Sequence, residues 1–82
     1  MKMMDCVEVV VEKQSYAIEG VHKGMQGWIC AEPCVDGYVL VNFPQYGEKA
    51  DIAEMSVKVE DLIQIPKMDA RINEKIKAQF DD

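Results

Sequence analysis

The sequence is short of the features that mark secreted and membrane proteins. It has three cysteines, an odd number, where small secreted domains use an even set to build a disulfide framework. No apolar run approaches the roughly 20 residues that a membrane-spanning helix needs. Behind Lys2 there is no apolar segment of the kind found in signal peptides. We therefore expect a cytoplasmic protein whose thiols are reduced.

Positive charge is also scarce. Nine basic side chains stand against fifteen acidic ones, which gives a net charge of −6 at pH 7. A negative field repels phosphate backbones and attracts cationic partners, so we expect no nucleic-acid binding. The acidity has two interpretations: it keeps the chain soluble, or it steers the chain toward a basic protein.

The length of the chain limits it to one hydrophobic core. With 82 residues, a second domain is excluded. Apolar residues make up 49% and charged residues 29%, which is typical of a globular protein and too apolar for a disordered one. We expect residues 1–66 to form a β-barrel and residues 67–82 to form a C-terminal helix and tail.

Alternating apolar and polar residues predict five short strands. They cover residues 5–12, 28–31, 38–43, 52–59 and 63–65. The polar, glycine-punctuated stretch 13–24 is predicted to be a long loop that ends in a tight turn. Pro33 is expected to stop strand pairing, and Asp36-Gly37 is a strong turn signal. Residues 60–62 are expected to form a single turn before the last strand.

The spacing of apolar residues changes after Pro66 from that of a strand to that of a helix. Met68, Ile72, Ile76 and Phe80 recur every four residues in a stretch rich in helix formers. This spacing predicts a terminal helix of about three turns over residues 69–80.

The order of these elements indicates an all-β fold, a five-stranded SH3-like barrel with a C-terminal α-helix. Short strands joined by glycine-rich turns, with a one-turn element before the last strand, suit a small barrel whose closure removes exposed sheet edges. An OB-like barrel and an open sheet are the alternatives.

Two motifs resemble a known family. Residues 23–29 read KGMQGWI, and residues 37–43 read GYVLVNF; a closing Asp61-Leu62 follows. Across residues 5–65 the chain resembles KOW-type SH3-like barrels, and more narrowly a group of small bacterial stand-alone SH3-like domains. The resemblance implies an interaction or toxin-neutralising protein with no catalytic role. The chain departs from KOW-type nucleic-acid binders because it lacks a basic patch.

Residues that carry chemistry are few and poorly arranged for catalysis or metal binding. Cys30 and Cys34 are spaced C-x₃-C, and His22 and Cys6 are further soft donors for zinc. The spacing is more typical of packing residues, so we expect no metal and no cofactor. A single histidine in a loop offers no base and orienting group for a nucleophile. We therefore expect no enzyme activity.

Alternation along the predicted hairpin produces an apolar outer patch. If Ile29, Val41 and Phe43 point into the core, then Trp28, Cys30, Tyr38 and Leu40 must share the opposite face. The apolar stripe of the C-terminal helix either packs on the barrel of its own chain and covers this patch, or joins it as an interface with another molecule. An aromatic cage of Tyr16, Trp28 and Tyr46 is a further alternative.

These features lead to two hypotheses for the function. The first is a protein-interaction module, an immunity-type inhibitor whose acidic surface neutralises a basic toxin or nuclease. The second is an accessory subunit or homodimer assembled through Trp28, Tyr38, Leu40 and the C-terminal helix. The acidic side chains expected to contact a basic partner are Glu8, Glu12, Glu32, Asp36, Glu48, Asp51 and Glu54.

Overall fold

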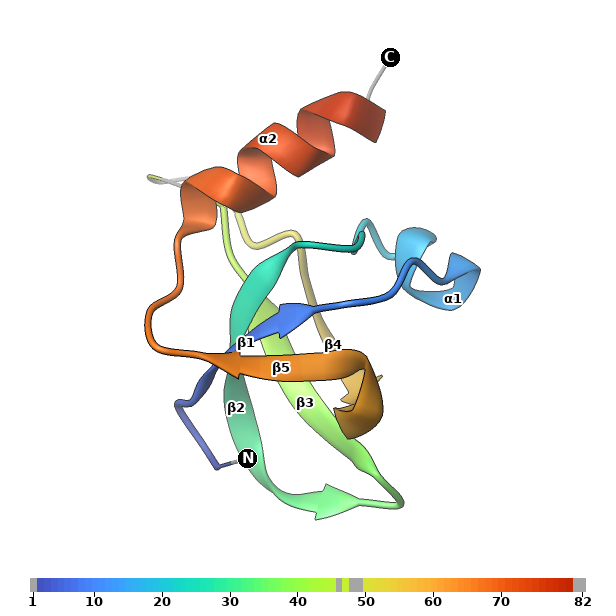
Figure 1. Ribbon diagram of the computed structural model, residues 1–82, viewed down its shortest axis with the longest axis vertical. Coiled ribbons are helices and arrows are strands. Elements are labelled where there is room, and N and C mark those ends of the chain that lie inside the picture. The colour runs from blue at the N-terminus through green and yellow to red at the C-terminus, as the bar shows by residue number, and fades with distance from the viewer. Residues whose placement is uncertain (1, 46, 48–49, 81–82) are drawn as a thin grey trace.

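A computed structural model describes residues 2–45, 47 and 50–80 of the chain, without the side chains of residues 32–35. The described part is mainly β, with one long helix at its C-terminal end (Figure 1). Its elements in chain order are β1 (Cys6–Val9), α1 (Gln14–Ala17), β2 (Gln26–Val35), β3 (Tyr38–Phe43), β4 (Ala53–Lys58), the 3₁₀ turn η1 (Val59–Asp61), β5 (Leu62–Ile65) and α2 (Ala70–Phe80).

The five strands form one antiparallel sheet in the order β4-β3-β2-β1-β5. This confirms that the chain forms five strands and is mainly β, although the first strand ends at Val9 and not at Glu12. It does not confirm a closed barrel, because β4 and β5 are the two edges and the strand pairing does not join them. The turn η1 connects these edges along the chain, and the open sheet curls around a single core.

The core forms on the face of the sheet that alternation predicted. Val7 and Val9 of β1 and Ile29 of β2 are fully buried. Cross-strand pairing places Val41 opposite Ile29, and both are fully buried, as is Phe43 two residues further along β3. Leu62 of β5 and Val57 of β4 belong to the same cluster, although their strands lie at opposite edges. The curled sheet thus buries one continuous apolar face.

The second strand differs from its prediction at both ends. It begins at Gln26, two residues earlier than expected, and continues through Pro33 to Val35. Pro33 does not end the strand because the β2–β3 ladder is already irregular there, with a register shift between Ala31 and Val35. At the start of β2, a Cβ on Gly27 would lie 2.2 Å from the carbonyl oxygen of Asn42. Glycine is therefore needed for this close approach of two strands.

The loop between β1 and β2 contains a short helix that the sequence pattern does not reveal. In α1 the Tyr16 side chain is buried, and its hydroxyl donates a 2.6 Å hydrogen bond to Asp61 Oδ2. Lys13 Nζ lies 2.6 Å from the same oxygen. The Tyr16 hydroxyl also accepts a 3.1 Å bond from the Lys58 backbone N–H. These contacts hold the loop against η1 and the end of β4.

Asp61 couples this attachment to pH. Its hydrogen bonds, first to Lys13 and then to Tyr16, lower the pKa of the carboxyl below its ordinary value of 3.8. Because the folded pKa is lowered, the stabilisation is present above the unfolded pKa and is lost as pH falls through the folded pKa.

We expect Asp61→Asn to lower the free energy of unfolding at neutral pH by about 2 kcal/mol, since a buried hydrogen-bonded charge is removed. Comparing urea unfolding of the variant and the parent from about pH 6 down to about pH 2 isolates Asp61, because the other titrating groups are common to both proteins. The difference in free energy of unfolding between the parent and the variant should shrink below pH 3.8. A difference that stays constant with pH would contradict the idea that the ionised Asp61 carboxylate stabilises the attachment of the loop.

The helix α2 lies across the end of the sheet where β2 begins and β3 ends (Figure 1). Asn73 is fully buried, and its side chain bonds both backbone groups of Gln26 and the carbonyl oxygen of Pro44, at 2.7 to 2.8 Å. Ile76 packs against the core cluster. At the last turn, the Phe80 ring stacks on His22 with centroids 3.5 Å apart. Within the described part of the chain, neither α1 nor α2 is long and apolar enough to span a membrane.

Candidate partner-binding face

The face of the sheet opposite the core carries a strip of apolar side chains. Strand pairing sets Trp28 of β2 opposite Cys6 of β1, and Cys6 opposite Ile65 of β5. On β3, Leu40 and Tyr38 lie two and four residues before Asn42, the cross-strand partner of Trp28, so they share this face. We call this surface the outer face. It is formed by Cys6, Trp28, Tyr38, Leu40, Ile63 and Ile65, with Glu8 and Glu54 among them.

Part of the outer face is open to solvent. Tyr38 is 39% exposed and Ile63 is 47% exposed, while Trp28 and Leu40 are half-buried. Scattered exposed apolar residues are common on proteins, but here exposed Tyr38 of β3 and Ile63 of β5 share one face with the half-buried Trp28 and Cys6 of the two strands between them. Their arrangement gives an apolar surface that crosses these strands, with an aromatic residue at the start of β3.

One expectation was that the apolar stripe of α2 covers the whole apolar patch of β2 and β3, and the helix is placed differently. Its hydrogen bonds and ring contact reach Gln26, Pro44 and His22, at the end of the sheet where β3 finishes. Tyr38 begins β3, at the opposite end, about 13 Å from Asn42 at the usual strand rise. Phe80, the last residue of the stripe, stays 54% exposed. The physical reason is that buried Asn73, rather than the apolar stripe alone, fixes where the helix docks.

Two of the predicted acidic residues lie on the outer face itself. Glu8 is directly opposite Gln26 and accepts a 3.0 Å hydrogen bond from its Nε2. Glu54 of β4 is exposed and lies directly opposite Asn42 of β3. Lys58 is the basic residue on this face; it pairs with Tyr38 in the ladder, and its Nζ lies 6.0 Å from the ring centroid. The two glutamates therefore lie on either side of Trp28 in the strand order, Glu8 on β1 and Glu54 on β4.

The other predicted acidic residues are dispersed. Asp51 is exposed and accepts a 2.9 Å bond from Asn42, next to the outer face. Asp36 is exposed at the tip of the β2–β3 hairpin, in a left-handed conformation with φ of 54°. Glu12 instead faces the loop before β2. The side chain of Glu32 and all of Glu48 lie outside the described residues.

Glu12 has a structural role that explains its orientation. Its carboxylate accepts a 2.8 Å bond from the Lys23 backbone N–H and lies 2.7 Å from His22 Nδ1. These two hydrogen bonds, that of Lys23 first, lower the pKa of Glu12 below its ordinary value of 4.5. The carboxylate is thus engaged within its own chain, which makes it a weaker candidate for contact with a partner.

Of the two cysteines proposed as zinc ligands at C-x₃-C spacing, the structure describes the side chain of Cys30. Cys30 Sγ lies 3.3 Å from Glu54 Oε1 and 3.6 Å from the carbonyl oxygen of Leu40. Burial first, and then the hydrogen bond to Glu54, raises the pKa of the Cys30 thiol above its ordinary value of 9.0. The side chain of Cys34 lies outside the described part. No group of three or more His, Cys, Asp or Glu side chains within that part is arranged to hold a metal ion.

An aromatic cage of Tyr16, Trp28 and Tyr46 is not supported by the described residues. Tyr16 is buried and bonded to Asp61, next to the end of β4. Trp28 lies on the outer face of β2, and Tyr46 is outside the described residues. The Tyr16 hydroxyl is instead held in place as a structural group, and burial raises the pKa of that phenol above its ordinary value of 10.0.

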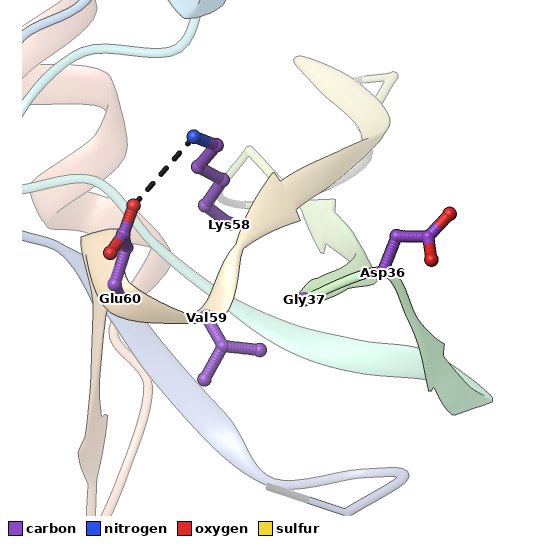
Figure 2. Close-up of a pocket in the computed structure, with 5 residues that line it drawn as sticks. All are labelled: Asp36, Gly37, Lys58, Val59 and Glu60. Atoms are coloured by element: carbon purple, nitrogen blue, oxygen red, sulfur yellow. Dashed lines mark ion pairs between the residues drawn. The ribbon is translucent and has the colours of Figure 1, made fainter.

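A hollow of about 440 Å³ lies between the β2–β3 turn and η1 (Figure 2). It is lined by Asp36, Gly37, Lys58, Val59 and Glu60. Figure 2 shows the Asp36 carboxylate pointing away from the ion pair between Lys58 and Glu60, which are 3.7 Å apart. The charged groups of this hollow do not converge on a common point, so it lacks the arrangement of a binding site.

Sequence reasoning missed the contribution of β1 and β5 to the outer face. Cys6, Ile63 and Ile65 join Trp28 only because β1 pairs with both β2 and β5. No local signal in the sequence specifies these long-range pairs, although the alternation within each strand would have indicated which residues share a face.

Comparison with protein-family models, with curated proteins and with solved structures found no significant match.

Proposed function

We propose that the chain is a protein-interaction module that binds a basic protein through its outer face, as an immunity-type inhibitor of a basic toxin or nuclease would. The observation that carries this proposal is the open apolar strip of Trp28, Leu40 and Tyr38 with Glu8 and Glu54 on the same face. Apolar contact supplies affinity at such a surface, whereas the glutamates favour a cationic partner and oppose an anionic one.

We also propose that the fold is an SH3-like variant whose sheet stays open. Support comes from the strand order β4-β3-β2-β1-β5 and from the one-turn η1 between the last two strands, where the sequence pattern predicted a single turn. This fold leaves binding surfaces on its sheet and loops, but it specifies no particular partner.

The second candidate is a homodimer joined through the same face. The exposure of Ile63 and Tyr38 favours the homodimer, since a twofold interface would bury both residues against the same face of the second molecule. The charges oppose it, because such an axis would bring Glu8 and Glu54 of two copies onto one interface. A crosslinked product of twice the chain mass in the experiment below identifies this outcome.

Position-specific photocrosslinking tests the proposed function. A benzophenone amino acid at Tyr38 should crosslink a basic protein in the cell of origin. The same group at Ile18, which is 74% exposed but lies beyond α1, is the matched control and should not yield that product. Adding Glu8→Lys and Glu54→Lys to the Tyr38 variant should abolish the product.

Crosslinking that is equal from both positions would count against the outer face as a binding surface. So would a Tyr38 product that is acidic, or one that survives both charge reversals.

A further inference from the structure

A second hollow, of about 390 Å³, lies at the β4 edge of the sheet where α1 and the end of β4 meet. It is lined by Lys13, Ser15, Tyr16, Tyr38, Ser56 and Lys58. Both charged residues among these are lysines, in a chain whose net charge is −6. The charged side chains that line the hollow are therefore opposite in sign to the glutamates of the outer face.

One wall of the hollow is fixed before any ligand arrives. Asp61 holds the Tyr16 hydroxyl and Lys13 Nζ, each at 2.6 Å, and the Tyr16 hydroxyl also accepts the Lys58 backbone N–H. Asp61 neutralises the charge of Lys13, so the role of Lys13 is mainly to shape this wall. A preorganised wall loses little conformational entropy when a ligand binds.

The side chain of Lys58 offers the hollow a cation with a weak partner. Lys58 Nζ lies 3.7 Å from Glu60, whose side chain is 74% exposed, and an ion pair so exposed to water is weak. Lys58 Nζ also lies over the Tyr38 ring, at 6.0 Å from its centroid. Its charge is thus available to a ligand that enters beside Tyr38.

Two hydroxyl groups and an apolar surface complete the lining. Ser15 and Ser56 are exposed, and their hydroxyls have no hydrogen-bond partner in the part of the chain that the structure describes. Met55, which packs against the core cluster, contributes an apolar side to the hollow. Free hydroxyl donors and an ammonium group are the groups that carboxylates and phosphates prefer.

We propose that this hollow binds an oxyanion, a carboxylate or a phosphate, carried on a flat apolar group. Lys58 and the hydroxyls of Ser15 and Ser56 take the oxyanion, while Tyr38 and Met55 contact the apolar part. The volume is at the lower end of the range for ligand pockets, which suits a ligand about the size of one aromatic side chain. This site shares Tyr38 and Lys58 with the outer face, but it does not depend on the proposed function, because it binds a small anion and not a basic protein.

Titration of the full chain with phenyl phosphate, benzoate and inorganic phosphate, followed by ¹H–¹⁵N NMR at low salt, tests the site. We expect saturable shifts at the amides of Ser15, Ser56 and Lys58, and tighter binding of phenyl phosphate than of inorganic phosphate. The stronger of the two aromatic probes identifies the preferred oxyanion.

Lys58→Met keeps the apolar stem and removes the charge. It should lower the affinity for the tighter-binding aromatic probe about tenfold. Lys75→Met, at an exposed position on α2, is the charge-matched control and should leave the affinity within about twofold. If Lys58→Met disturbs the fold, Ser56→Ala at an exposed position serves as the second variant. It should lower the affinity for the same probe about threefold.

Three results would overturn this assignment. The first is the absence of saturable shifts with either aromatic probe. The second is an equal loss of affinity in Lys58→Met and Lys75→Met, which indicates general attraction to lysines. The third is inorganic phosphate binding as tightly as phenyl phosphate, since the apolar wall would then have no role.

Discussion

Asn73→Ala is expected to lower the free energy of unfolding by about 3 kcal/mol, a large part of the stability of so small a domain. The Asn73 side chain bonds the backbone N–H and C=O of Gln26 and the C=O of Pro44. Without it, these groups stay buried without partners, or α2 detaches and exposes Ile76 and the core beneath it. Urea unfolding monitored by far-UV circular dichroism measures the loss.

Lys75→Ala is the control for this change, since Lys75 is exposed on the same helix and its replacement should alter stability by less than about 0.5 kcal/mol. A loss in Asn73→Ala no larger than that of the control would mean that the helix is not attached through Asn73. The docking of α2 at the start of β2 would then need another explanation.

The strands were predictable because their signal is local. In β3 the expected range, residues 38–43, agrees with the observed strand, and alternation correctly assigned Val41 and Phe43 to the core. The turn at Asp36-Gly37 was also predictable, because both residues adopt the left-handed backbone that Asp and Gly tolerate. Closure of a barrel was not predictable, because it depends on whether two distant edge strands pair.

The short helix α1 and the docking of α2 were missed for a related reason. A four-residue helix has no periodicity to detect, and α1 is held by the tertiary contact between Tyr16 and Asp61. Asn73 reads as a surface residue in the sequence, yet it is fully buried because strand-end backbone groups require its amide. Local patterns do not reveal such polar partnerships.

The placement of the proposed partner-binding residues was predictable only in part for the same reason. Alternation placed Trp28, Tyr38 and Leu40 on one face, and the structure shows them there. Charge in the sequence does not show which carboxylates are engaged internally, as Glu12 is with His22, and which lie on that face, as Glu8 and Glu54 do. The strand register identifies Glu8 and Glu54, and the hydrogen bonds of the folded loop identify Glu12.

Reversing the two glutamates of the outer face is the second change with a large expected effect. Glu8 of β1 and Glu54 of β4 lie on either side of Trp28 in the strand order, so a cationic partner would approach between them. At low salt, long-range attraction of this kind raises association rates by an order of magnitude or more, and salt screens it. We expect Glu8→Lys combined with Glu54→Lys to slow association at least about tenfold at low salt.

Stopped-flow association of the basic partner recovered by the Tyr38 crosslink measures this directly. Trp28 is the chain's single tryptophan and lies on the outer face, so its emission reports binding there. Glu19→Lys, an exposed charge reversal beyond α1, is the matched control. The account predicts a rate that falls at least about tenfold in the double variant, changes little in the control, and loses this difference at high salt. Equal rates for the double variant and the parent at low salt would contradict the outer face as the surface that recognises a basic protein.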